Sequence, residues 1–127
     1  MLETLLFGIP GVMEALAPDT PVHCSEVVRM EEEFRVYVVE GQIRALCQYK
    51  GEKYETPRVD LEVIKAAVAA FYADSHLAGF GIDFAVIAKE DGTIATCLVE
   101  VNDGYSLGRY EGLSGKDYTD LLALRWK

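Results

Sequence analysis

The 127-residue sequence has few cysteines, and no two of them stand at the spacing of a metal site. Its three cysteines, Cys24, Cys47 and Cys97, are odd in number, and each lies in an apolar, strand-like stretch. This pattern indicates buried free thiols in a reducing compartment rather than disulfides. The two histidines, His23 and His76, are isolated, so the Cys/His ligand spacing of a zinc site is missing.

Positive charge is also scarce. The chain has 12 Lys and Arg against 21 Asp and Glu, which gives a formal net charge of −9 at pH 7. Such a chain repels phosphate backbones and anionic lipids, so we expect neither nucleic-acid binding nor membrane binding. The acidic balance fits general solubility, and it also fits a surface that meets a basic protein partner.

Long hydrophobic runs are missing as well. The apolar stretch 1–17 carries no basic residue, is interrupted by Glu3 and Glu14, and is too short to span a bilayer. We therefore expect a cytoplasmic protein. Since a chain of 127 residues can bury a core of its own, we expect residues 1–127 to form a single domain, with residues 1–21 as an N-terminal helical segment.

The pattern of apolar residues and turn signals predicts two hairpins. The first has arms at 34–39 and 42–48 around Glu40-Gly41, and the second has arms at 81–89 and 93–102 around Glu90-Asp91-Gly92. Around them we expect helical pieces at 2–7 and 11–17, a strand at 22–30, a helix that starts after the N-cap Asp60 and ends before Gly79, and a final helix at 116–126. The expected fold class is α+β, with an antiparallel sheet of two hairpins packed against helices.

The second hairpin carries acidic residues on one face. If it is centred on Asp91-Gly92, Asp83 lies opposite Glu100, and Asn102 shares the face of Glu100. Two opposed carboxylates stand roughly 5 Å apart at Cβ and repel each other. A divalent cation held by oxygen ligands would offset this repulsion. The alternative is that the carboxylates reach solvent or pair with a Lys or Arg, and a three-residue turn would separate them.

The remaining face of that hairpin is expected to be core, as is one face of the first hairpin. The expected core residues are Ile82, Phe84, Val86, Cys97, Val99 and Val101, together with Phe34, Val36, Val38, Ile43, Ala45 and Cys47. The polar face of the first hairpin would collect Glu33, Arg35, Tyr37, Arg44 and Gln48. An arginine on a sheet face beside a metal site suits phosphate binding, because a guanidinium grips phosphate oxygens bidentately. An ordinary solvated face with cross-strand ion pairs is the alternative.

Three stretches of the chain resemble ATP-grasp enzymes. Residues 33–43 resemble their E/D-x-R-x-x-V-V-x-G-x-V hairpin, residues 81–86 their G-x-D-x-x-V strand, and residues 98–104 their V-E-V-N strand and loop. Order and spacing agree across residues 22–126. The resemblance implies the C-terminal, metal-binding half of an ATP-grasp fold, whose members join a carboxylate to an amine through an acyl phosphate made with ATP.

By this resemblance, Asp83, Glu100 and Asn102 would bind Mg²⁺. Arg35 would be the catalytic residue that contacts the phosphates of ATP or the acyl phosphate. The loop 103–110 would face the substrate, a small-molecule carboxylate or a peptide.

Two departures from the family pattern concern the nucleotide. Family members usually carry a second Arg near the end of the first hairpin, and Arg44 or Lys50 would replace it here in cofactor binding. The lobe that normally precedes this region has little room before Glu33. Met1 begins a plausible capped segment, which favours a naturally short chain.

The missing lobe leaves several readings open. The chain is a truncated enzyme, or a dimer partner or second protein supplies the lobe, or catalysis is lost. In the last case the acidic chain would be a binding module, such as an immunity or inhibitor protein, that neutralises a basic toxin or nuclease.

Overall fold

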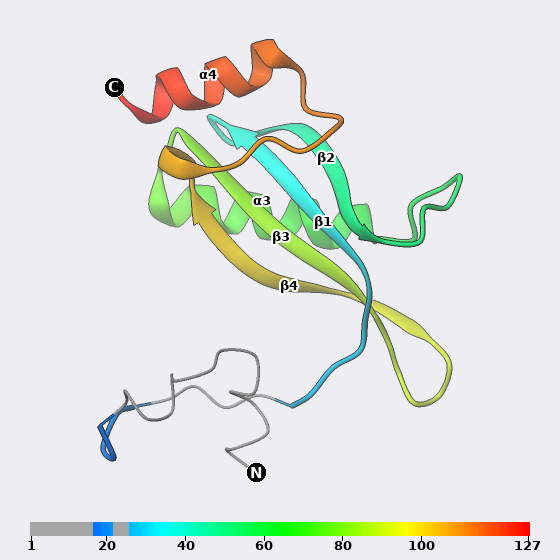
Figure 1. Ribbon diagram of the computed structural model, residues 1–127. Helices are drawn as coiled ribbons and strands as arrows, with labels where there is room; N and C mark the ends of the chain where they lie inside the picture. The colour runs from blue at the N-terminus through cyan, green and yellow to red at the C-terminus, as the bar shows by residue number, and fades with distance from the viewer. Residues whose placement is uncertain (1–16, 22–25) are drawn as a thin grey trace.

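The computed structural model describes residues 17–21 and 26–127 and confirms the α+β class (Figure 1). In chain order the elements are β1 (Met30–Val39), β2 (Gln42–Gly51), α3 (Leu61–Ser75), β3 (Gly79–Ala88), β4 (Ile94–Asp103), the 3₁₀ helix η1 (Gly104–Ser106) and α4 (Gly115–Arg125). The strands form one antiparallel sheet in the order β2-β1-β3-β4. Within the described residues, no helix is both long enough and apolar enough to cross a membrane.

The N-terminal expectations are only partly testable. The helical pieces lie outside the described residues, apart from Ala17, which is not helical. The strand expected at 22–30 is wrong over residues 26–29, because β1 begins at Met30. The physical reason is the length of the neighbouring strand. Met30 pairs with Ile87, and β3 ends one residue later, so residues before Met30 have no ladder to join.

Helix α3 covers one face of the sheet (Figure 1). It begins as expected after Asp60, whose carboxylate accepts hydrogen bonds from the backbone N–H groups of Glu62 and Val63 at 2.9 and 3.4 Å. It ends at His76, which adopts the left-handed conformation. Between helix and sheet lies the first core cluster, formed by Phe34, Val36, Val38, Val59, Ile64, Val68, Phe80, Ile82, Phe84 and Val86.

Helix α4 and the loop before it cover one end of the opposite face (Figure 1). A second core cluster lies there, formed by Tyr37, Val39, Cys47, Leu107, Leu113 and Leu121. At this end β1 and β3 are buried from both sides, which explains the unbroken buried runs in both strands. The rest of this face holds the polar side chains of the candidate site.

Three residues, Arg44 and Tyr49 of β2 and Val99 of β4, have no partner across the strand ladder. Each is the extra residue of a β-bulge, which bends a strand and re-aims its side chains. Beyond Arg44, Ala45 and Cys47 pack in the second cluster with Tyr37, not with Phe34 as expected.

The bulges also correct other expected core positions. Tyr37, expected on the polar face, is fully buried, whereas Ile43, expected in the core, is 40% exposed. Cys97 pairs with Ala85 on the face opposite α3, and Val99 is 37% exposed, so neither joins the first cluster.

The turn of the second hairpin has three residues, since the Lys89 N–H donates to the Thr93 carbonyl oxygen. Its register, which pairs Ala88 with Ile94, would by itself separate Asp83 from Glu100. The bulge at Val99 shifts the register by one residue, and Asp83 then pairs with Glu100. The predicted opposition of the two carboxylates is confirmed, but through a bulge that the pattern did not contain.

Replacing Gly51 with alanine is expected to destabilise the protein more than the same change at Gly92. Both residues have a positive φ, +91° and +81°, which costs a residue with a Cβ roughly 1–2 kcal/mol. A Cβ at Gly51 would clash with the Glu31 backbone, whereas one at Gly92 meets nothing within 4 Å. We expect about 1–3 kcal/mol of further loss at Gly51 from this overpacking. Urea unfolding of both variants measures the difference, and equal losses would contradict the packing described.

Candidate functional site

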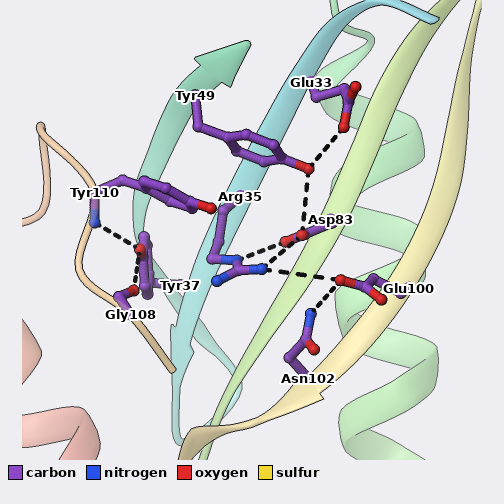
Figure 2. Close-up of polar contacts among 9 residues, drawn as sticks. All are labelled: Glu33, Arg35, Tyr37, Tyr49, Asp83, Glu100, Asn102, Gly108 and Tyr110. Atoms are coloured by element: carbon purple, nitrogen blue, oxygen red, sulfur yellow. Dashed lines mark hydrogen bonds and ion pairs between the residues drawn. The ribbon is translucent and has the colours of Figure 1, made fainter. Parts of the chain in front are cut away.

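An ion pair between β1 and β3 forms the centre of the polar face (Figure 2). The Arg35 guanidinium donates from Nε to Asp83 Oδ1 and from Nη2 to Asp83 Oδ2, both at 2.7 Å. The two residues are paired across the strands, and the Asp83 side chain is only 2% exposed. These hydrogen bonds raise the pKa of Arg35, so it stays charged at any physiological pH. Of the possibilities left open by the sequence, pairing of Asp83 with an arginine is the one observed.

Glu100 and Asn102 lie beside this pair on β4 (Figure 2). Glu100 Oε1 stands 4.0 Å from Arg35 Nη2 and accepts a hydrogen bond of 3.0 Å from Asn102 Nδ2. The Glu100 side chain is 57% exposed, in contrast to Asp83. In the described part of the chain, Glu100 Oε2 and Asn102 Oδ1 accept no side-chain hydrogen bond.

The bulge at Tyr49 brings two consecutive side chains of β2 to the same cluster. The Tyr49 hydroxyl lies 3.1 Å from Glu33 Oε2 and 3.4 Å from Asp83 Oδ2, and Lys50 forms an ion pair with Glu33. Burial, the charge of Asp83 and the hydrogen bond to Glu33 raise the pKa of the Tyr49 phenol well above its usual range. Tyr49 therefore acts as a neutral donor between two carboxylates.

The loop after η1 is held over the cluster by a buried tyrosine. The Tyr37 hydroxyl donates to the Gly108 carbonyl oxygen at 2.7 Å and accepts from the Tyr110 backbone N–H at 2.9 Å (Figure 2). The Tyr110 ring stacks on Tyr49, with centroids 4.8 Å apart, and lies 5.1 Å from the Arg35 guanidinium carbon. The loop thus covers one side of the guanidinium with an aromatic ring, an arrangement favourable to a cation.

The structure brings together some of the residues predicted from sequence and separates another. Arg35, Asp83, Glu100 and Asn102 form one cluster, and Lys50 reaches its edge through Glu33. Arg44 is placed elsewhere, since its guanidinium pairs with Asp117 in the first turn of α4 at 3.7 Å.

The donor set of this cluster fits a hard divalent cation. Carboxylate and amide oxygens are the ligands that Mg²⁺ takes, and Glu100 and Asn102 present such oxygens near solvent. Asp83 offers a further carboxylate directly across the ladder, although both of its oxygens accept hydrogen bonds from Arg35. Over residues 17–21 and 26–127, no three His, Cys, Asp or Glu side chains gather as a ready metal site. A metal would therefore share its carboxylates with the guanidinium.

The sequence analysis missed the aromatic part of the site. Tyr49 and Tyr110 are far apart in the chain, and their stacking depends on a bulge and on the path of a loop. The one available signal was the placement of Tyr49 beside Lys50 at the end of the first hairpin, where the resemblance implies a nucleotide-binding residue.

Comparison with known proteins gives one match over most of the chain. A family described as an ATP-grasp domain, the second family of its clade, matches residues 8–121. No curated protein matches the sequence.

Two solved structures share part of the fold at low identity. The ATP-grasp ligase PsnB, complexed with a minimal precursor, is 20% identical, with a TM-score of 0.49 over 80% of this chain and 36% of that one. The macrocyclase MdnB from Microcystis aeruginosa MRC is 20% identical, with a TM-score of 0.45 over 80% of this chain and 40% of that one. The chain thus spans well under half the length of either.

Changing Tyr37 to phenylalanine is expected to loosen the loop over the site. It removes both hydrogen bonds of a fully buried hydroxyl and leaves two backbone groups unpaired, at a cost of about 1–3 kcal/mol. Tyr72→Phe serves as the control, since the Tyr72 hydroxyl makes no hydrogen bond to a described residue. Hydrogen exchange at the Tyr110 amide should accelerate in the first variant only. Unchanged exchange would show that the tyrosine does not hold the loop.

The phenol of Tyr49 is expected to titrate late. Because its pKa is raised in the folded protein, its protonated form adds stability that is fully present below about pH 10, the ordinary tyrosine value, and is lost as the pH rises further. Absorbance at high pH, compared between the wild type and Tyr49→Phe, should show one late phenol missing in the variant. The variant should also lose less stability between neutral and alkaline pH. If the missing phenol titrates near pH 10, the described environment of Tyr49 is wrong.

Proposed function

The chain belongs to the ATP-grasp domain family, and we propose that its polar sheet face binds the phosphates of MgATP as the metal-binding half of a carboxylate–amine ligase. The observation that carries this proposal is the cluster of Arg35, Asp83, Glu100 and Asn102 on one face. It combines a fixed guanidinium with oxygen donors suited to a divalent cation, which is the chemistry that phosphoryl transfer needs.

In this proposal Arg35 is the phosphate-binding residue, and Asp83 holds it in position. Nε and Nη2 are occupied by Asp83, whereas Nη1 makes no hydrogen bond to a described side chain. The guanidinium can therefore offer Nη1 to an anion without giving up its buried partner. A fixed donor costs little reorganisation when charge develops on a transferring group.

Glu100 and Asn102, with Asp83, are the residues that would hold Mg²⁺. When bound, the cation would bridge phosphate oxygens and neutralise their charge. The hydrogen bond from Asn102 keeps Glu100 turned toward the arginine, so the ligand oxygens are oriented in advance. The carboxylates in turn keep the local charge near neutral before any anion arrives.

The aromatic stack of Tyr49 and Tyr110 would exclude water from one side of the guanidinium. In a water-poor site, the attraction between Arg35 and a phosphate is stronger than in bulk solvent. A second lobe, in the same protein or in a partner chain, would close the other side. The acyl phosphate would form when a substrate carboxylate oxygen attacks the γ-phosphorus and ADP leaves. The amine would then displace phosphate at the carbonyl carbon and release a proton.

Titration calorimetry with MgATP tests the proposal. The wild type should bind saturably and only with Mg²⁺, and Glu100→Gln should weaken binding by about tenfold, since a charge-assisted contact is worth on the order of 1.5–3 kcal/mol. Glu100 is exposed, so this variant should fold normally. Asp83→Asn should lose binding too, with circular dichroism and thermal unfolding as checks, because its buried partner is left uncompensated.

Glu90→Gln is the matched control, since Glu90 is an exposed carboxylate in the turn of the second hairpin. It should bind MgATP like the wild type. Equal binding by the Glu100 and Glu90 variants would exclude the cation role, and no saturation at millimolar MgATP would exclude nucleotide binding by this chain on its own.

A further inference from the structure

A pocket of about 360 Å³ adjoins the Arg35 cluster but belongs to a different set of side chains. Its wall includes the Tyr49 and Tyr110 rings, so the aromatic stack touches both the cluster and the pocket. The other lining residues are Gln48, Lys50, Gly51, Lys53 and Glu111. Its volume lies at the lower end of the range of roughly 300–1,000 Å³ for small-molecule sites. It has room for one small organic group.

The wall of the pocket is held in shape by hydrogen bonds and backbone geometry. The Gln48 side-chain amide donates to the carbonyl oxygens of Lys50 and Glu52, at 3.2 and 2.8 Å. Gly51, between the two lysines, turns with φ +91° at a position where any side chain would strike the Glu31 backbone. The segment that carries Lys50 and Lys53 is thus fixed by its own contacts.

The charges of the pocket are uneven. Two of its lining residues are lysines and one is a glutamate, so it carries one net positive charge on a chain whose net charge is −9. Lys50 is engaged with Glu33. Lys53 has no carboxylate within 4 Å among the described residues, although most arginines and lysines there are paired. A cation left unpaired at the rim of a pocket, in so acidic a protein, indicates an anionic ligand.

We propose that this pocket binds a single carboxylate group of the substrate, with Lys53 as its charge partner and the Tyr49–Tyr110 stack as the wall for the attached carbon chain. One net positive charge matches one carboxylate. A phosphate, which carries close to two negative charges, would meet more repulsion from Glu111 and Glu33. The inference rests on the proposed function, since it gives the ligase an acidic substrate held beside the Arg35 cluster.

The test uses small carboxylates as probes and nuclear magnetic resonance as the measurement, because it detects weak binding. N-acetyl-glutamate N-methylamide represents a peptide side chain, glutarate a free acid, and N-acetyl-glutamine N-methylamide the neutral counterpart. We expect one or both acids to shift the backbone amides of Gly51 and Glu111 saturably, and the neutral probe to bind at least about tenfold more weakly. The tighter acid identifies the source of the carboxylate.

Lys53→Gln should weaken the carboxylate about tenfold as well, and Lys53→Arg should retain it. Lys89→Gln is the matched control, since Lys89 likewise lacks an ion pair within the described part of the chain but does not line this pocket. Equal binding of the acid and the neutral probe, wild-type affinity in Lys53→Gln, or no saturation by either acid would overturn the inference.

MgATP titration of the same variants separates this inference from the proposed function. Lys53→Gln should bind MgATP like the wild type. Intact MgATP binding without carboxylate binding would refute only the carboxylate pocket. Carboxylate binding without MgATP binding would refute the nucleotide role and leave the pocket as a site for an acidic ligand.

Discussion

The bidentate ion pair between Arg35 and Asp83 is the interaction from which the geometry of the polar face follows. A carboxylate as buried as Asp83 would cost several kcal/mol without a compensating cation. Arg35 supplies that cation and is itself oriented by it, while Tyr110 packs over the guanidinium. The pair explains why Asp83 is closed to solvent while Glu100, opposite it on the next strand, stays open to a ligand.

Most of the secondary structure could be predicted from sequence, because its signals are local. Asp60 caps its helix with its own side chain, and the two turns carry glycine where a positive φ is needed. The β-bulges could not be predicted, because nothing local marks the residue that a ladder skips. Missing the bulge at Arg44 was enough to place Ala45 and Cys47 on the wrong face.

The candidate site divides along the same line. Arg35, Asp83 and Glu100 could be grouped from sequence because alternation along a strand and pairing across a hairpin are short-range rules. The contact between Tyr49 and Tyr110 could not, since it joins the end of one hairpin to a loop that follows the other. Arg44 shows the converse error, because a residue of suitable charge was drawn away to Asp117 by the packing of α4.

The grip of Tyr37 on the loop has an evolutionary consequence. The hydroxyl bonds only main-chain atoms of Gly108 and Tyr110, which every residue type except proline can offer at the amide. A side chain added at Gly108 would meet open space. Side chains along this loop can therefore be exchanged while its anchorage is kept. Such a domain can diversify what it recognises by substitutions at the loop surface, without a corresponding loss of fold.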